Sequence, residues 1–290
     1  MEQIHFGKTF KKIRLAKLYD QTKVSGKILH QTSFSKFELG KIDITVSKFV
    51  ELLNSIEMKF EEFLYVHNNY NYSLRDEIIN KFNNLKFLDG DLLVELISDA
   101  QSYLHDKEDN LVRDILYSCQ GLYILKTERD FKKAGFYANK VWKRLQKSNI
   151  WYLSDLRLIN SILFLFPLDT ARHIVQFADS QLDKYKKYTD YKKYILPFKY
   201  NLVHLFLREG YYEDAFKYNE ELIEEFLEQK TYVQIALCYL RKGIIQEKLL
   251  MKNNIDYIQK AESIVTLFND NSLKNQLEIE KGYLTQLLHL

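Results

Sequence analysis

An alanine placed between two large apolar residues, each three positions away, recurs five times between residues 97 and 264. On a helix, residues three apart share a face, so a small residue between large ones lets a neighbouring helix approach closely. Successive alanines are 34, 37, 44 and 46 residues apart. The pattern therefore predicts five helix pairs, with an alanine on the second helix of each. The five repeats are Ile97/Ala100/Tyr103, Phe131/Ala134/Tyr137, Leu168/Ala171/Ile174, Tyr212/Ala215/Tyr218 and Ile258/Ala261/Ile264.

The segments before the alanine helices are apolar at helical spacing and contain few breaks, since the whole chain holds only two prolines and nine glycines. They predict partner helices over 75–88, 111–127, 150–166, 190–208 and 231–249, and a capping helix over 272–289. Repeats of this length are typical of tetratricopeptide-like solenoids. Because the spacing is unequal, a plain helical bundle stays open as the alternative.

The N-terminal residues follow a different pattern, in which short amphipathic stretches are joined by tight turns. They predict helices over 7–18, 23–29, 33–39, 45–55 and 59–67, with Thr22 and Thr32 as N-caps of the second and third. This spacing is that of a helix-turn-helix domain. The expected fold class is all-α, with a five-helix helix-turn-helix domain at 1–66, a linker at 67–74 and a tetratricopeptide-like helical-hairpin solenoid at 75–290.

The third predicted helix has two different faces. Phe34 and Phe37 lie one turn apart and are expected to be buried, which places Ser35 and Lys36 on the opposite face. Gly40 is expected to end the helix as its C′ residue.

Charge is distributed unevenly along the chain. Residues 1–48 hold ten lysines or arginines and four acidic residues, a net charge of +6, whereas the whole chain carries +3 and the remainder therefore −3. A basic end on a mildly acidic body is typical of a protein that binds a polyanion at that end. A solvated basic surface is the alternative.

The stretch from Gln31 to Lys41, QTSFSKFELGK, resembles the recognition helix of phage-repressor-like, XRE-type regulators. Together with the preceding GKTFKKIR at 7–14, it resembles the Rgg/GadR/MutR family of regulators from low-GC Gram-positive bacteria. The resemblance implies that Arg14 pairs with Glu38. Two departures are Leu39, where relatives often carry a basic or polar residue, and Lys36 in place of the more usual arginine, which weakens a bidentate guanine contact.

The same resemblance implies that five residues of the third predicted helix approach double-stranded DNA: Gln31, Thr32, Ser33, Ser35 and Lys36. We expect three basic residues, Arg14, Lys23 and Lys41, to bind DNA as well. The resemblance further implies that the helical repeats bind a short, hydrophobic signalling peptide that is secreted and re-imported, and that the protein is a homodimer.

The concave surface of a solenoid is lined by the first helix of each pair. Asn160 and Asn201 interrupt apolar segments on two of those helices, and a carboxamide can both donate to and accept from an extended peptide backbone. The alternative for each such residue is a contact between helices. By helix phase, the expected peptide-binding residues are Arg113, Tyr117, Gln120, Arg157, Asn160, Tyr200, Asn201, His204, Gln234, Cys238 and Arg241.

No motif for catalysis, metal binding or a cofactor is found in the sequence. The seven histidines and the two cysteines, Cys119 and Cys238, have no metal-ligand or redox spacing, and no glycine cluster forms a phosphate loop. Both thiols are expected to be reduced and buried. With no signal peptide and no apolar run long enough to span a bilayer, we expect a cytoplasmic protein with no membrane partner, no catalytic residues and no cofactor.

These features favour a sequence-specific transcriptional regulator that binds an inverted-repeat operator and is controlled by a peptide held in its repeat domain. The alternative is a protein-interaction scaffold whose DNA-binding head is vestigial.

Overall fold

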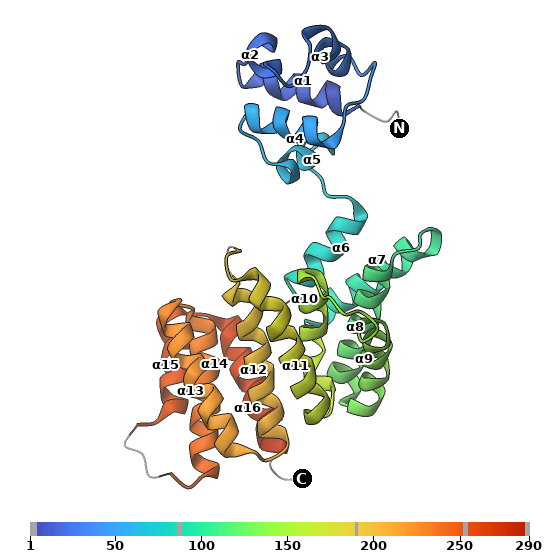
Figure 1. Cartoon of the computed structure of the whole chain (residues 1–290). Helices are drawn as coiled ribbons and strands as arrows, with labels where there is room; N and C mark the ends of the chain where they lie inside the picture. The colour runs from blue at the N-terminus through green and yellow to red at the C-terminus, as the bar shows by residue number, and fades with distance from the viewer. Residues whose placement is uncertain (1–4, 86–88, 189–190, 252–254, 288–290) are drawn as a thin grey trace. The chain divides into compact units, whose positions relative to one another are not determined.

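The computed structural model describes residues 5–85, 89–188, 191–251 and 255–287, and within them every regular element is a helix (Figure 1). The chain divides into two compact units, Met1–Glu77 and Ile78–Leu290. The division falls inside α6 (Leu74–Asn83), just after the linker predicted at 67–74. Because every regular element in the described residues is helical, the predicted all-α fold class is confirmed.

The N-terminal unit holds five short helices around a core of phenylalanines. Phe10, Phe34, Phe37, Phe49 and Phe63 are all buried, and their rings meet mostly edge to face. The helices are α1 (Phe6–Ala16), α2 (Gln21–Ser25), α3 (Gln31–Glu38), α4 (Val46–Ser55) and α5 (Phe60–His67).

The starts of α2 and α3 differ from the prediction. The N-cap of α2 is Asp20, whose carboxylate accepts from the Lys23 amide, and α3 begins after His30. Thr22 and Thr32 therefore lie inside the first turns and do not cap them. An aspartate two residues upstream is an equally good N-cap, so composition alone did not decide between the two.

The C-terminal unit is a succession of helices: α7 (Gly90–Asp106), α8 (Asn110–Glu128), α9 (Phe131–Leu145), α10 (Leu153–Ser161), α11 (Leu168–Leu182), α12 (Lys192–Arg208), α13 (Tyr212–Glu228), α14 (Tyr232–Lys248), α15 (Tyr257–Phe268) and α16 (Asn271–Leu287), with short 3-10 helices η1 (Leu163–Leu165) and η2 (Asp183–Tyr185). The five alanines of the sequence repeat, one each on α7, α9, α11, α13 and α15, are 0% exposed. The predicted pairing is confirmed for α8 with α9, α12 with α13 and α14 with α15, whereas α7 packs mainly on the following α8 and α11 on the following α12.

The helix predicted over 150–166 is interrupted. It runs as α10 only to Ser161, followed by η1 and an extended Phe166. Pro167 disfavours helical dihedrals at the residue before it, which explains why the helix cannot continue into α11.

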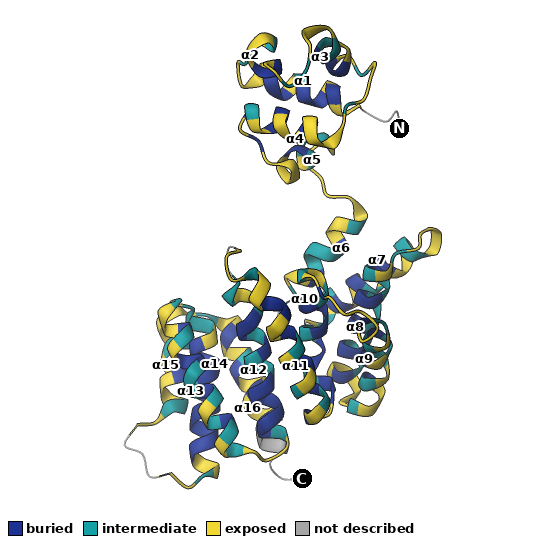
Figure 2. Cartoon of the chain, in the orientation of Figure 1, coloured by how far each residue is buried: buried dark blue, intermediate teal, exposed yellow. Residues whose placement is uncertain are grey.

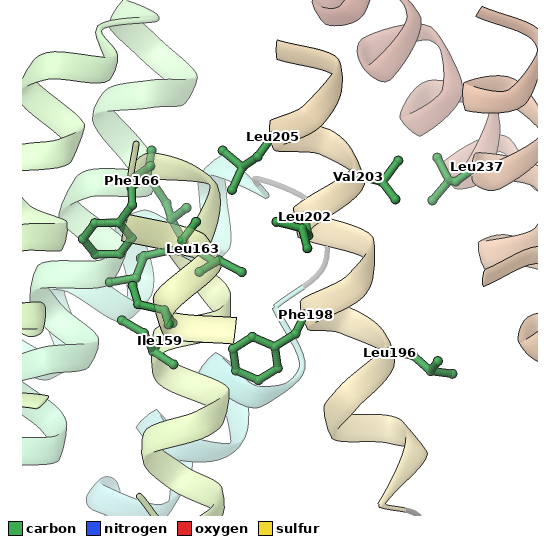
Figure 3. Packing of buried hydrophobic residues seen from close by; sticks show 14 of the residues in the cluster. Ile159, Leu163, Phe166, Leu196, Phe198, Leu202, Val203, Leu205 and Leu237 are labelled. Carbon is green, nitrogen blue, oxygen red and sulfur yellow. The ribbon is translucent and has the colours of Figure 1, made fainter. Parts of the chain in front are cut away.

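Helix α12 lies in the centre of the C-terminal unit and is buried along most of its length (Figure 2). Figure 3 shows Phe198 and Leu205 pointing towards the α10–η1 side and Val203 towards Leu237 of α14. The final helix, α16, packs back against α12 and α14. Helix α12 also contacts α10, α11, α13 and η1, so it meets other elements on several sides.

Both cysteines are buried and unpaired, as expected, and burial raises the pKa of each thiol to about 12. No helix in the described part of the chain has both the length and the apolar character that a membrane span requires.

Candidate functional site

The outer face of α3 is polar and accessible within the N-terminal unit. Gln31, Thr32 and Lys36 are exposed and Ser33 and Ser35 are half-buried, while Phe34 and Phe37 anchor the opposite face in the core. Two of the other predicted residues, Lys23 on α2 and Lys41 after α3, are also exposed. Short polar side chains with flanking lysines are suited to base edges and phosphates.

Arg14 lies inside the unit, at 4% exposure. Its Nε and Nη2 donate to the two carboxylate oxygens of Glu38 at 2.6 and 2.9 Å, and Nη1 donates to the Tyr19 carbonyl oxygen at 2.6 Å. The predicted Arg14–Glu38 pair is confirmed. The hydrogen bonds that Arg14 donates to the Glu38 carboxylate raise the pKa of Arg14 despite the opposing effect of burial. Arg14 thus fixes α3 against α1 and, unlike the other seven predicted residues, offers no surface to DNA.

Gln21, which was not predicted from sequence, connects this ion pair to the surface of α3. Its Nε2 donates to Glu38 at 2.7 Å, and its Oε1 accepts from the Ser35 hydroxyl at 3.1 Å. A series of side-chain hydrogen bonds therefore links Ser35 through Gln21 and Glu38 to Arg14, and this series orients the Ser35 hydroxyl. The sequence feature that could have identified Gln21 is its place at the start of α2, the helix that precedes the one carrying Ser35.

Two glycines set the geometry of α3. Gly40 has φ +68° and its amide donates to the Phe37 carbonyl at 2.8 Å, which confirms it as the C′ residue. Gly7 lies so close to α3 that a Cβ atom there would sit 1.7 Å from the Phe37 carbonyl oxygen. Only glycine at position 7 permits this approach of α1 to α3.

In the C-terminal unit, three adjoining cavities follow one face of α12, and we call them together the α12 groove. The face is formed by Lys193, Pro197, Tyr200, Asn201 and His204, whose spacing puts them on one side of the helix. The groove thus follows a helix that several other elements contact.

The inner cavity, of about 250 Å³, is walled mainly by apolar side chains from five elements and the segment after α6. The outer cavity, of about 680 Å³, shares Phe82, Leu85 and Ser161 with it. The third cavity, of about 700 Å³, shares Tyr200 with the inner one and extends towards α13, α14 and α16. An extended ligand could therefore run continuously along α12.

A buried ion pair forms one wall of the inner cavity. Arg241 of α14 and Glu280 of α16 are 1% and 2% exposed, with Nε donating to the carboxylate at 2.7 Å. The guanidinium carbon lies 3.7 Å from the centre of the Tyr200 ring, and Nη1 donates to the Tyr200 carbonyl oxygen at 2.8 Å. The pair joins three helices, so Arg241 has a structural contact as well as a place in the cavity wall.

The Tyr200 hydroxyl oxygen is buried and makes no hydrogen bond with any residue in the described part of the chain. Burial raises the pKa of Tyr200 well above its ordinary value, so the hydroxyl stays protonated and is a donor. A buried donor without a partner is costly, which makes this group a candidate for contact with a ligand.

Asn160 and Asn201 meet each other across the groove. Asn201 Nδ2 donates to the Asn160 carbonyl oxygen at 2.9 Å and to its Oδ1 at 3.1 Å. This is the helix-to-helix contact left open by the sequence. Among the described residues, no hydrogen bond engages Asn201 Oδ1 or Asn160 Nδ2, so one acceptor and one donor are left at the groove.

The structure brings together seven of the eleven predicted peptide-binding residues and leaves four apart. Arg157, Asn160, Tyr200, Asn201, His204, Gln234 and Arg241 line the groove. Arg113, Tyr117, Gln120 and Cys238 line none of its three cavities, and Cys238 is fully buried.

On α8 the side facing the groove carries Leu122 and Leu125. At about 100° per residue, these lie on nearly the opposite face from the three predicted polar residues. Sequence analysis missed this apolar wall, because a leucine that lines a cavity cannot be distinguished in the sequence from a leucine in the core.

The family model of the C-terminal domain of the HTH-type transcriptional regulator Rgg matches residues 99–279. No curated protein sequence matches the chain.

Several solved structures share the fold over nearly the whole chain. A protein of Listeria monocytogenes EGD-e described as a transcriptional regulator has a TM-score of 0.70 at 18% identity, covering 99% of this chain and 98% of its own. Bacillus thuringiensis PlcR, in complex with the peptide PapR7 and DNA, has a TM-score of 0.64 at 17% identity, covering 94% and 98%. The Streptococcus dysgalactiae SHP pheromone receptor Rgg2 has a TM-score of 0.65 at 13% identity, covering 96% and 99%.

Proposed function

This chain belongs to the Rgg family of HTH-type transcriptional regulators, and we propose that it is a cytoplasmic, homodimeric DNA-binding regulator controlled by a short hydrophobic peptide. The observation that carries the proposal is that one chain combines an accessible polar face on α3 with a partly apolar groove along α12. Among the similar solved structures, those of PlcR and of ComR from S. thermophilus are complexes with both DNA and a peptide.

The DNA-binding half rests on the N-terminal unit. Gln31, Thr32 and Lys36 are exposed on α3, and a helix of this kind reads the major groove with its outward side chains. Lys23 and Lys41 flank that face and supply phosphate contacts. Two such units in a homodimer would bind half-sites of an inverted repeat.

The peptide-binding half rests on the α12 groove. Its inner cavity is mostly apolar, while Asn160, Asn201 and Tyr200 present hydrogen-bonding groups beside it. An apolar pocket with a few convergent polar groups is the usual form of a ligand site. The polar atoms suit a peptide backbone, and the apolar walls suit its side chains.

Helix α6 provides the covalent route from the groove to the DNA-binding unit. Ile78 and Phe82 are buried in the C-terminal unit, and Phe82 also lines the inner cavity, whereas the first turn of the same helix belongs to the N-terminal unit. If the protein has two conformations that differ in the position of α6, a peptide with a higher affinity for one of them would shift the population towards it and so change DNA binding.

Fluorescence anisotropy with the full-length protein tests this function. Duplexes selected by the protein from a random pool should converge on an inverted repeat, and binding should weaken steeply as salt rises. Hydrophobic peptides of 6–10 residues should raise the melting temperature and change operator affinity. Peptide binding without enrichment of any duplex would favour the scaffold alternative instead.

A further inference from the structure

A second basic surface, unconnected with the predicted DNA-binding residues, lies on α9 of the C-terminal unit. Residues 131–150, which include α9, contain six lysines or arginines and no aspartate or glutamate, whereas residues 78–290 as a whole carry a net charge of only +1. The six are Lys132, Lys133, Lys140, Lys143, Arg144 and Lys147. Positive charge is therefore concentrated on this one helix of a nearly neutral unit.

Most of the lysines of α9 are not neutralised by the protein itself. Within the described residues, three of the four have no carboxylate at ion-pair distance: Lys132, Lys140 and Lys143. The fourth, Lys133, pairs with Glu128 at 2.6 Å. Lys132 and Lys143 are exposed, so their charges are available to an anion from outside the chain.

Aromatic rings surround the ammonium group of Lys140. Its Nζ lies 4.6, 4.8 and 5.1 Å from the ring centres of Tyr117, Phe136 and Tyr137. The negative faces of such rings attract a cation, but the rings carry no net charge. The three rings therefore favour one position of the ammonium group and leave its charge uncompensated.

An exposed phenylalanine lies in the middle of the row of lysines. Lys132, Phe136, Lys140 and Lys143 follow one another at intervals of four, four and three residues, which places them on one face of the helix. Phe136 is 60% exposed, although it is one of the large apolar residues that proteins usually bury. An apolar centre with charged residues at its rim is typical of a surface that binds another protein.

The apolar centre distinguishes between the anionic partners that lysines attract. A nucleic-acid backbone would pair with the lysines but would bury little apolar surface against Phe136. A helix that lies on a membrane inserts a continuous apolar face, and that of α9, which includes Ala138 and Val141, is buried inside the unit. A protein segment with an aliphatic or aromatic side chain among its carboxylates matches both the charge and the apolar centre.

We propose that the face formed by Lys132, Phe136, Lys140 and Lys143, here called the α9 surface, binds an acidic segment of a partner protein. The three lysines pair with carboxylates of the segment, and Phe136 packs against an aliphatic or aromatic residue between them. This partner is additional to the operator and the signalling peptide, and its binding requires neither of them.

The test uses full-length protein and three fluorescein-labelled dodecapeptide pools of random order. The first is two thirds aspartate and glutamate and one third leucine and phenylalanine. The second has serine in place of the apolar residues, and the third has asparagine and glutamine in place of the acidic ones. By fluorescence anisotropy at low salt, wild-type protein should bind the first pool about three to ten times more tightly than either of the others.

The variants assign this binding to the α9 surface. Lys132→Glu/Lys143→Glu should weaken binding of the first pool about tenfold or more, because it places like charges against the carboxylates. Lys217→Glu/Lys248→Glu is the matched control: both lysines are exposed in the same unit, have no carboxylate partner among the described residues, and give the same change in net charge. The control should stay within about twofold of wild type.

Phe136→Ala tests the apolar centre separately from the charges. It should bring the affinity for the first pool to within about twofold of the affinity for the serine pool, since the contact that distinguishes the two pools is lost. Phe136 is exposed, so the variant should remain folded, which circular dichroism verifies for every variant.

Each contrary result overturns a defined part of this inference. Equal affinity of wild-type protein for the acidic–apolar and amide pools would exclude an acidic partner. Tight binding that survives in Lys132→Glu/Lys143→Glu would place the peptides elsewhere, such as the α12 groove. If that variant instead loses affinity only for a duplex of unrelated sequence, the α9 surface binds nucleic acid and the proposal is wrong. None of these results alters the test of operator and signalling-peptide binding.

Discussion

Arg14 donates two hydrogen bonds to Glu38, at 2.6 and 2.9 Å, and this buried ion pair joins α1 to the helix that presents the polar face. Through Gln21 the same carboxylate also fixes Ser35. The orientation of α3 therefore depends on one charge pair as well as on its phenylalanines.

Glu38→Gln should destabilise the N-terminal unit by about 3–5 kcal/mol, because it leaves the Arg14 guanidinium buried without a counter-charge. Both tryptophans, Trp142 and Trp151, belong to the C-terminal unit. Urea unfolding followed by far-ultraviolet circular dichroism should show an early loss of helix that tryptophan fluorescence does not. The double variant Arg14→Met/Glu38→Leu should recover most of the loss, and a double variant no better than Glu38→Gln would contradict the ion-pair account.

Gly7→Ala should also unfold the N-terminal unit selectively, because its methyl group would lie 1.7 Å from the Phe37 carbonyl oxygen and force α1 away from α3. Gly135→Ala on α9 is the matched control, since its Cβ would meet only the Leu165 carbonyl oxygen at 3.7 Å. That change should be neutral or stabilising by up to about 1 kcal/mol, as expected for alanine within a helix. Equal melting curves for the two variants would count against the close helix approach.

Lys36→Ala should weaken operator binding and reduce the slope of log K against log salt by about one, the value for one lost phosphate contact. Lys36→Glu should abolish binding, since it places a like charge against the duplex. Lys147→Glu makes the same charge change at an exposed site in the C-terminal unit and should leave the affinity nearly unchanged. Anisotropy titrations at several salt concentrations measure all three, and an unaltered Lys36→Glu affinity would exclude α3 as the reading helix.

His204 should make the C-terminal unit less stable in acid. Burial lowers its pKa from 6.5 to about 4, so below pH 6.5 the unfolded chain takes up a proton that the folded chain does not. The free energy of unfolding therefore falls as the pH drops from 6.5 towards 4, by about 2 kcal/mol at pH 5 relative to neutral pH.

Tryptophan-monitored urea unfolding at pH 5 and pH 7.5 measures this effect. His204→Gln should lose about that much of the pH dependence, whereas His173→Gln, at an exposed position of α11, should keep it. Identical pH dependence in wild type and His204→Gln would show that another group is responsible.

Sequence alone was sufficient where one chemical constraint determines position. The alanine repeat predicted five buried positions, because a small residue permits close helix packing, and all five alanines are buried. Three of the five predicted helix pairs pack together as expected. The Arg14–Glu38 pair followed from a family pattern that links two helices distant in the sequence.

Where several positions satisfy the same rule, sequence did not decide. Asp20 is the N-cap of α2, where Thr22 was predicted, and both aspartate and threonine are common N-cap residues. The polar side of α8 was expected in the groove, yet its leucines line it, because helix phase depends on packing partners that one sequence does not reveal.

Reciprocal linkage between peptide and operator tests the central claim most directly. With full-length protein, a selected operator and a bound peptide, operator affinity is measured with and without saturating peptide, and peptide affinity with and without saturating operator. We expect the two ratios to be equal and different from one, because both report a single coupling free energy. If both ligands bind but neither changes the affinity of the other, the protein is not a peptide-controlled regulator.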